Sequence, residues 1–189
     1  MNWMKQIELD WTLFLDRDGV INYESQDDYI MDWNTFRFLP GSIETFSIFG
    51  QLFKKVFIVT NQKGVGKGLM SEDDLIVIHK KLSSAVENAG GSIAKIYYCT
   101  ALEDEDPCRK PNNGMALMAK KDFPEIEFHK SIMVGNTMSD MQFGKSCGMF
   151  TVFIRSEKPG PASVDPLIDL VFSDLSSFAK ALQKSVSTK

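Results

Sequence analysis

The sequence is poor in the residues that mark disulfide scaffolds and histidine-based sites. It has three cysteines (Cys99, Cys108 and Cys147) and two histidines among 189 residues. An odd, small number of cysteines does not indicate a disulfide framework, so a reducing, cytoplasmic location is expected. His79 and His129 have no evident catalytic partner in the sequence. We therefore assign neither of them a catalytic role.

Long apolar runs and an excess of basic residues are also lacking. No run is long enough to span a membrane, and residues 1–10 lack the apolar core of a signal peptide. Lys and Arg number 21 against 25 Asp and Glu, which makes the formal net charge -4. Without a basic run, neither a nucleic-acid groove nor a membrane surface is an expected partner. The composition, 43% hydrophobic and 24% charged, is typical of a globular protein.

Short apolar runs of strand type alternate with segments of helical pattern. The expected strands are 12–16, 56–59, 93–99, 132–134, 150–154 and 170–172, and the expected helices are 42–52, 71–89, 114–123, 139–147 and 174–184. This alternation predicts right-handed βαβ units, and therefore a doubly wound, Rossmann-like α/β fold with a parallel sheet. Residues 155–168 are the most linker-like stretch, but the strand and helix after them are too short to fold alone. Residues 1–189 are therefore expected to form a single domain.

The first expected strand ends abruptly on two carboxylates, Asp16 and Asp18, with Gly19 directly after them. A buried carboxylate costs free energy unless another group pairs with it. At the carboxyl end of a parallel strand, a cation and an anionic substrate can supply that pairing. Open α/β sheets bind their ligands in the crevice outside these strand ends.

Polar groups follow three further strands. They are Thr60-Asn61, then Arg109-Lys110-Pro111 beyond an acidic loop, and Gly135-Asn136 with Asp140. Phosphoryl transfer needs a nucleophile, charge neutralisation and a proton for the leaving oxygen. Carboxylates, a hydroxyl and a lysine at neighbouring strand ends supply these functions, so the pattern favours a phosphatase.

These motifs resemble the haloacid dehalogenase superfamily of phosphohydrolases over residues 12–184. That family has an Asp-x-Asp-Gly motif, a Ser/Thr at a strand end, a Lys and an acidic Gly-Asp motif. The sequence is also similar to the subgroup of heptose-bisphosphate and histidinol-phosphate phosphatases. The similar segments are Asp16-Arg17-Asp18-Gly19-Val20-Ile21-Asn22, Phe36-x-Phe38-x-Pro40-Gly41, Thr60-Asn61-Gln62-x-Gly64, Cys108-Arg109-Lys110-Pro111 with Gly114-Met115, and Val134-Gly135.

The resemblance implies a role for each motif. Asp16 would attack phosphorus and form an aspartyl-phosphate, and Asp18 would act as general acid and then as general base. The Thr60 hydroxyl and groups of Asn61 would hold phosphoryl oxygens. Two basic residues complete the site: Lys110 would offset negative charge, and Arg109 would reach a second anionic or hydroxyl group of the substrate.

The resemblance also implies a Mg²⁺ cofactor held by oxygen ligands. Asp16, the main-chain carbonyl of Asp18 and Asn136 would bind the ion, and Asp140 is a further candidate, directly or through water. Asn136 stands where the family has an aspartate, so one formal charge is lost and weaker binding of Mg²⁺ is expected. Asp140 can equally be read as a charge that favours a helix N-terminus.

Relatives in this subgroup carry a zinc loop with a Cys-x-His and a Cys-x-Cys. Cys99 and Cys108 match its ends, but Ala101 and Asp106 replace the histidine and the other cysteine. Because two thiolates do not complete a tetrahedral site, no structural zinc is expected. The four acids of residues 103–106 are expected to repel a polyanionic substrate.

The expected function is a Mg²⁺-dependent phosphomonoesterase that acts, as a monomer, on a small sugar phosphate such as heptose bisphosphate. The intervals between the motifs leave no room for a large cap domain, so specificity would come from residues 23–34, 62–70 and 100–109. Histidinol-phosphate phosphatase and a weakly active phosphometabolite-binding protein stay open. A phospho-receiver domain fits less well, because both acids follow one strand. Gly64 to Gly68 lacks P-loop spacing and is expected to be a flexible, substrate-side loop.

Overall fold

The computed structural model describes residues 3–24, 29–155 and 165–186. Within them, six strands form one sheet in the order β3-β2-β1-β4-β5-β6, and every neighbouring pair is parallel. The strands are β1 (Thr12–Leu15), β2 (Lys55–Asn61), β3 (Lys95–Cys99), β4 (Ser131–Gly135), β5 (Phe150–Ile154) and β6 (Leu170–Phe172). The predicted parallel, doubly wound α/β fold is confirmed.

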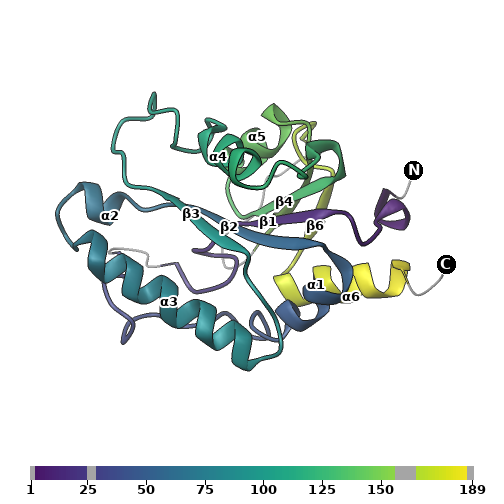
Figure 1. Ribbon diagram of the computed structural model, residues 1–189, viewed down its shortest axis with the longest axis horizontal. Helices are drawn as coiled ribbons and strands as arrows, with labels where there is room; N and C mark the ends of the chain where they lie inside the picture. Colours follow the sequence, from purple (N-terminus) through teal and green to yellow (C-terminus); the bar gives the residue numbers. More distant parts are fainter. Residues whose placement is uncertain (1–2, 25–28, 156–164, 187–189) are drawn as a thin grey trace.

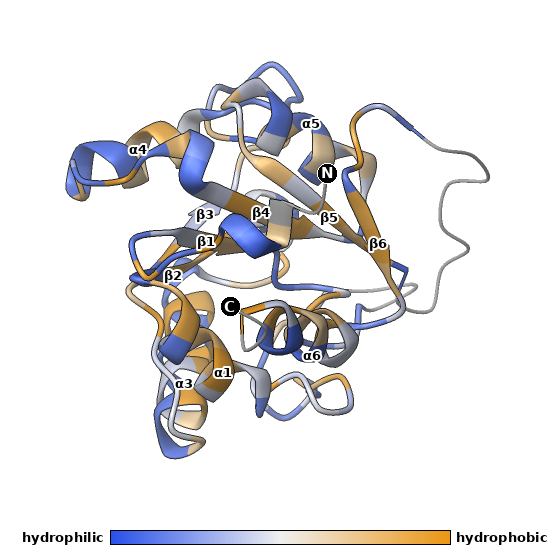
Figure 2. Ribbon diagram, turned by 90° about the vertical axis from the view of Figure 1, so that its right-hand side faces the viewer, coloured by the Kyte–Doolittle hydropathy of each residue, from blue (hydrophilic) through white to orange (hydrophobic). Residues whose placement is uncertain are grey.

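Helices cover both faces of the sheet (Figures 1 and 2). One face carries α1 (Thr45–Leu52), α3 (Glu72–Asn88) and α6 (Leu175–Val186), and the other carries α4 (Gly114–Asp122) and α5 (Met138–Ser146). The shorter turns are α2 (Lys63–Gly66), η1 (Trp3–Gln6) and η2 (Phe128–Lys130). In the described part of the chain, no second sheet stands over the strand ends, as expected for a fold without a large cap.

The central strands are mostly apolar because the helices bury both of their faces. Leu13 and Leu15 of β1 point into the core beneath α1, α3 and α6, while Phe14 points into the second core beneath α4 and α5. There its ring packs against Phe57 of β2, with the centroids 5.3 Å apart. Each such buried side chain stabilises the fold by about 2 kcal/mol. The central strands are therefore anchored from both sides, which fixes the ends that carry the polar residues.

Two predicted elements differ from the structure. The first helix begins at Thr45 and not at Ser42, because the Ser42 hydroxyl donates to the Ile21 carbonyl, at 2.6 Å, in place of capping a helix. The expectation of a flexible loop at 64–68 is wrong, since Lys63–Gly66 forms the short helix α2. A Cβ at Gly66 would lie 2.1 Å from the Thr100 carbonyl, so glycine is needed for this close approach.

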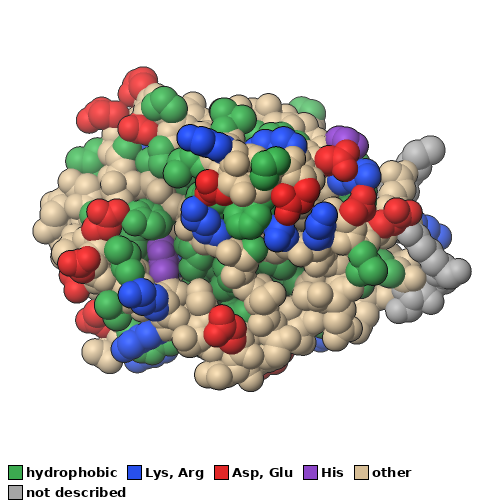
Figure 3. Space-filling view, in the orientation of Figure 1, with side chains coloured by type: hydrophobic (Ala, Val, Ile, Leu, Met, Phe, Trp, Pro, Cys, Tyr) green, Lys and Arg blue, Asp and Glu red, His purple; other side chains and the backbone are tan. Residues whose placement is uncertain are grey.

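The distribution of surface charge can be compared with the expectation that the protein binds neither nucleic acid nor a membrane. Basic side chains lie among acidic ones on the face shown in Figure 3 and do not merge into one basic patch. Among the described residues, no helix has the length and apolar character needed to cross a membrane. The stretch 156–164, which is most of the linker-like segment, lies outside the described residues, as do 25–28 of the expected specificity segment.

Candidate active site

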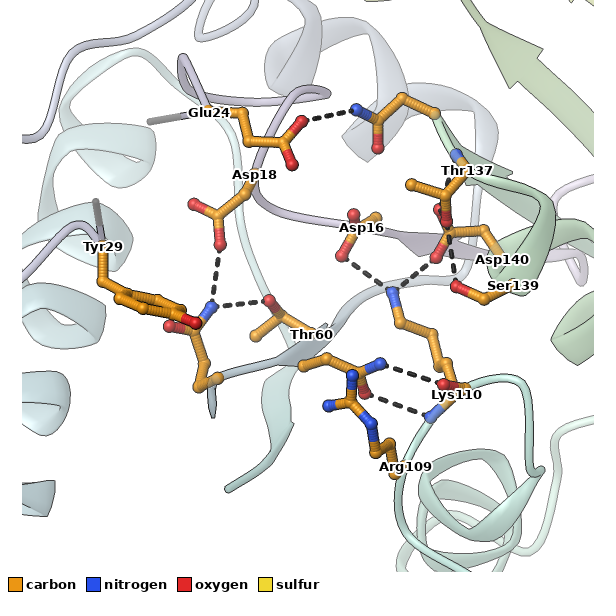
Figure 4. A pocket seen from close by; sticks show the side chains of 13 residues that line it. Asp16, Asp18, Glu24, Tyr29, Thr60, Arg109, Lys110, Thr137, Ser139 and Asp140 are labelled. Atoms are coloured by element: carbon orange, nitrogen blue, oxygen red, sulfur yellow. Dashed lines mark hydrogen bonds and ion pairs between the residues drawn. The ribbon is translucent and has the colours of Figure 1, made fainter. Parts of the chain in front are cut away.

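The polar residues at the strand ends line one cavity of about 290 Å³ at the carboxyl edge of the sheet. It opens where the strand order reverses, next to β1, with β2 on one side and β4 on the other. The lining residues are Asp16, Asp18, Glu24, Tyr29, Thr60, Asn61, Gln62, Arg109, Lys110, Asn136, Thr137, Ser139 and Asp140. All eight residues expected from the sequence are among them (Figure 4).

Asp16 continues the strand direction of β1, and its N–H donates to the Val134 carbonyl at 2.9 Å. Its carboxylate accepts a hydrogen bond from Lys110 Nζ at 2.8 Å. Burial raises the pKa of Asp16 to about 7; Lys110 opposes this rise, and the Asp140 carboxylate adds to it. A cation that comes close to Asp16 would therefore stabilise the charged form of its carboxyl group.

Lys110 is a buried cation between two acids, and not a surface lysine. Its Nζ donates to Asp140 at 2.6 Å and to the Val59 carbonyl at 2.8 Å, besides Asp16. Burial alone would lower its pKa, but the Asp140 and Asp16 carboxylates outweigh burial and raise the pKa above the ordinary value. In Figure 4 the side chain reaches between the two acids, so it holds a fixed positive charge at the cavity floor.

The Asn61 side chain explains how Lys110 is placed. Its amide nitrogen donates to the Lys110 carbonyl, and its oxygen accepts from the Lys110 N–H, both at 3.0 Å. Asn61 was expected to contact phosphate, but this pair of bonds holds its side chain on the Lys110 loop. The residue thus ties the end of β2 to the loop that follows β3.

Asp18 lines the cavity, and three side chains donate hydrogen bonds to its carboxylate. Arg17 Nη2 approaches its two oxygens at 2.9 and 3.0 Å, and the amides of Asn22 and Gln62 each donate at 2.8 Å. Burial would raise the pKa of Asp18, but Arg17 and these hydrogen bonds together lower it. The same Gln62 amide donates to the Thr60 hydroxyl at 2.8 Å, so one network orders both residues.

Asp140 caps α5 and balances Lys110. Its Oδ2 accepts from the Thr137 N–H at 3.0 Å and the Thr137 hydroxyl at 2.7 Å, while Oδ1 accepts from Lys110. Both oxygens are thus occupied. Asp140 thus acts both at the helix N-terminus, as one reading of the sequence suggested, and in the site. Because both of its oxygens accept hydrogen bonds, it is a poorer candidate than Asn136 for direct metal binding.

Asn136 provides the structural test of whether the site fits Mg²⁺. It follows β4, is 6% exposed, and its Oδ1 has no hydrogen-bond partner in the described structure. Its Nδ2 lies 3.4 Å from Glu24 Oε2, so the oxygen is the free end of the amide. A buried, unpaired oxygen in the cavity that Asp16 also lines suits a hard cation. Gly19, with φ +78°, is required here, because a Cβ would lie 2.0 Å from Asn136 Nδ2.

Arg109 forms an ion pair with Asp104, one acid of the loop 103–106. Arg109 Nε donates to Asp104 at 2.9 Å, and Lys63 Nζ lies 3.8 Å from the same carboxylate. Asp104 thus neutralises and orients basic groups at the cavity rim. Repulsion of a polyanion by this residue is reduced, because its charge is already paired.

The cysteines of the loop lie together. The Cys99 and Cys108 sulfur atoms and one carboxylate oxygen of Asp106, which could serve as metal ligands, all lie within 4.8 Å of one another. The carboxylate of Asp106, however, accepts from the Cys108 N–H at 2.8 Å, and burial together with Cys99 raises the pKa of the Cys108 thiol to about 12. These features oppose the thiolate form that zinc needs. The absence of structural zinc stays a prediction.

Sequence reasoning did not single out several lining residues. Glu24 and Tyr29 lie in the expected specificity segment 23–34, but this stretch is irregular and without periodicity, so no local pattern points to them individually. Gln62 directly follows a motif that was recognised, and Thr137 with Asp140 has the spacing of a helix-capping box. His79, for which no partner was evident, contacts Arg17 behind the site.

Comparison with known proteins agrees with this geometry. The family model described as "Polynucleotide kinase 3 phosphatase" matches residues 4–158. A D-glycero-alpha-D-manno-heptose-1,7-bisphosphate 7-phosphatase of Mycobacterium bovis is 35% identical over 91% of both chains. A D-glycero-beta-D-manno-heptose-1,7-bisphosphate 7-phosphatase of Vibrio cholerae is 31% identical over 86% of this chain and 91% of the relative.

Among solved structures, the D,D-heptose 1,7-bisphosphate phosphatase from B. bronchiseptica, complexed with magnesium and phosphate, superimposes with a TM-score of 0.80. The two chains are 26% identical, and the match covers 92% of this chain and 98% of that one. The family match spans well over half of the sequence. This chain therefore belongs to the haloacid dehalogenase superfamily of phosphatases, among the relatives of the heptose-bisphosphate phosphatases.

Proposed function

We propose that the protein is a Mg²⁺-dependent phosphomonoesterase acting on a small sugar phosphate, with heptose 1,7-bisphosphate as the first candidate. The observation that carries the proposal is the pairing of Asp16 with buried Lys110, beside the second acid Asp18, in one cavity at the sheet's switch point. The names of the relatives guide the choice of substrate. The three free cysteines support a cytoplasmic location. The face shown in Figure 3 carries mixed charge, which supports a small-molecule substrate over nucleic acid there. We further propose that the protein is a monomer.

Asp16, the Asp18 main-chain carbonyl and the Asn136 side-chain oxygen would hold the ion. When bound, Mg²⁺ supplies positive charge that offsets the repulsion between the Asp16 carboxylate and the phosphate. The buried, unpaired oxygen of Asn136 supports this ligand set. Asp140 stays with Lys110, whose charge adds to the same neutralisation.

In the first half-reaction, an Asp16 oxygen attacks phosphorus and forms an aspartyl-phosphate. The bond from phosphorus to the sugar oxygen breaks, its electron pair stays on that oxygen, and Asp18 donates a proton to it. Arg17 and its neighbours keep the free Asp18 ionised. A phosphate that enters beside Asp18 raises its pKa by like-charge repulsion, which lets the residue hold a proton.

In the second half-reaction, Asp18 takes a proton from water, which attacks the phosphorus. The bond from phosphorus to Asp16 breaks, and inorganic phosphate leaves. The Thr60 hydroxyl, oriented by Gln62, holds a phosphoryl oxygen. Arg109 at the rim binds a second anionic group of the substrate, and Asn61 keeps the Lys110 loop in place.

A substrate screen tests the proposal. Purified protein is assayed with Mg²⁺ or EDTA against both anomers of heptose 1,7-bisphosphate, other sugar phosphates, histidinol phosphate and a 3′-phosphorylated oligonucleotide. We expect Mg²⁺-dependent release of phosphate, fastest from a heptose bisphosphate and abolished in Asp16→Asn. If histidinol phosphate is the best substrate, the substrate assignment changes while the chemistry stands. If no compound is hydrolysed, the protein is a phosphometabolite-binding relative.

A further inference from the structure

A buried guanidinium lies directly behind the acid/base residue. Arg17 is 1% exposed although it belongs to the strand-end motif. Its Nη2 contacts both oxygens of Asp18 and also donates to Gln62 Oε1 at 3.1 Å, and its Nε donates to Asp18 at 3.1 Å. The orientation of this one group therefore fixes the Asp18 carboxylate. A buried arginine has five N–H donors, all of which need acceptors.

The other end of the guanidinium is held from α3. Arg17 Nη1 lies 3.1 Å from Nε2 of His79, which is 7% exposed, and the His79 ring packs against Tyr98 with centroids 5.5 Å apart. Because Nη1 can only donate, Nε2 accepts, and the proton of the imidazole lies on Nδ1. Burial, followed by the charge of Arg17, lowers the pKa of His79 to about 3. The imidazole is thus a neutral acceptor.

A neutral acceptor has a specific advantage at this position. A carboxylate here would compete with Asp18 for Arg17 and pull the guanidinium toward α3. An apolar side chain would leave a buried N–H of Arg17 without a partner, which is unfavourable and promotes reorientation of the guanidinium. Histidine satisfies the N–H and leaves the positive charge directed at Asp18.

We propose that His79 is a positioning residue for Asp18, acting through Arg17. The inference rests on the proposed function, in which Asp18 protonates the leaving sugar oxygen. Helix α3, which covers one face of the sheet, thereby controls the geometry of the general acid although it contributes no residue to the cavity lining (Figure 1).

The test compares two kinds of leaving group. A sugar alkoxide needs a proton from Asp18, whereas p-nitrophenolate leaves without one. His79→Phe keeps an aromatic ring beside Tyr98 but removes the acceptor, and His79→Gln keeps an acceptor oxygen. For H79F we expect kcat/KM on the sugar phosphate, which reports only the first half-reaction, to fall about 10- to 100-fold, and kcat/KM on p-nitrophenyl phosphate to change less than about 3-fold. H79Q is expected to recover most of the lost rate.

The controls separate this role from general destabilisation. His129→Phe alters an exposed histidine in η2, outside the cavity lining, and is expected to leave both rates unchanged. In an Arg17→Lys background, H79F is expected to have no further effect, because the two residues act in series. If H79F does not fold, His79→Met and H79Q, of similar size, make the same comparison.

Three outcomes overturn the proposal: equal losses on both substrates, no loss on the sugar phosphate, or no recovery in H79Q. If Asp16→Asn abolishes the hydrolysis of p-nitrophenyl phosphate, the proposed phosphatase chemistry holds. If Asp16→Asn leaves hydrolysis intact, the proposed function fails, and that failure is thereby distinguished from failure of the His79 assignment.

Discussion

Burial gives the charged form of Asp16 an electrostatic cost. Burial raises its pKa to about 7, and this rise exceeds the opposing effect of Lys110. A carboxyl group with a raised folded-state pKa stabilises the fold only while it is protonated, so its contribution is lost as the pH rises through about 7. The proposed nucleophile therefore lies where burial disfavours its charge and a nearby cation would favour it.

Asp16→Asn is expected to stabilise the metal-free protein at pH 8 by about 1–3 kcal/mol, because it removes this charge without changing the side-chain shape. Chemical denaturation in EDTA at pH 8 and pH 5 measures the effect. The gain should shrink at pH 5, where Asp16 itself is protonated. A loss of stability at pH 8 would mean that the ion pair with Lys110 outweighs the burial cost.

Asn136→Asp is expected to tighten Mg²⁺ binding about 10-fold, since it restores a formal charge among the ligands. Calorimetric titration with Mg²⁺ gives the affinity without relying on turnover. The new carboxylate would lie beside Glu24, 3.4 Å from Asn136 in the present structure, and repulsion there opposes part of the gain. The double variant with Glu24→Gln should bind more tightly still. An unchanged affinity in both variants contradicts Asn136 as a ligand.

At the scale of elements, α3 and α5 both begin with a capping box, but the two capping boxes have different roles. Ser71 and Asp74 form a capping box at the exposed start of α3, and Thr137 and Asp140 form one at the start of α5. In α5 the capping carboxylate also binds Lys110. The start of α5 is thus part of the cavity, and its order bears on the position of Lys110.

Ser71→Ala and Thr137→Ala form a matched pair. Each is expected to cost about 1 kcal/mol of stability through loss of a cap. Only Thr137→Ala should reduce kcat, about 10-fold, because it removes one of the two hydrogen bonds that hold Asp140 Oδ2 and so loosens the contact with Lys110. Denaturant titrations and steady-state rates measured side by side decide this. Equal rates in the two variants would show that the cap of α5 has no part in the site.

At the scale of the whole molecule, the site joins β1 and β4, which are adjacent although 115 residues separate Asp16 from Ser131 in the chain. Packing on both faces holds the two strand ends at a fixed separation. A cation bound by Asp16 and Asn136 therefore links distant parts of the chain and should stabilise the whole fold by mass action.

Mg²⁺ at 100 times its dissociation constant is expected to stabilise the protein by about 2.7 kcal/mol, or about 5–10 °C in Tm. Below pH 7 the apparent affinity should fall, toward about tenfold per pH unit, because Asp16 must release its proton before it binds the ion. Thermal melts with and without Mg²⁺ at pH 6 and pH 8 give both effects. The shift should vanish in Asp16→Asn; a shift that persists there would place the ion elsewhere.

Metal analysis of the purified protein is expected to find no stoichiometric zinc. Cys99, Asp106 and Cys108 lie close together, but the Cys108 thiol holds its proton and Asp106 is bound to the main chain. One zinc per chain, lost together with stability in Cys108→Ser, would contradict this prediction. Cys147→Ser, which alters a cysteine outside the group, is the control.

The succession of strands and helices, the strand-end motifs and the reaction class can be predicted from the sequence, because they depend on local pattern. Apolar runs define the strands, alternation with helices requires a parallel sheet, and Asp16 with Asp18 after a buried strand requires a cation. The predicted site residues all meet in one cavity for the same reason. Right-handed crossovers bring these strand ends to a single edge.

Only the tertiary structure decided which polar groups pair with one another through hydrogen bonds and ion pairs. Nothing local in the sequence shows that Asp140 pairs with Lys110 or that Asn61 holds a main chain 49 residues away. The contact of His79 with Arg17 spans 62 residues. Hydrogen bonds of buried groups depend on which neighbours the packing supplies, and neighbours brought together by a parallel sheet lie far apart in the chain.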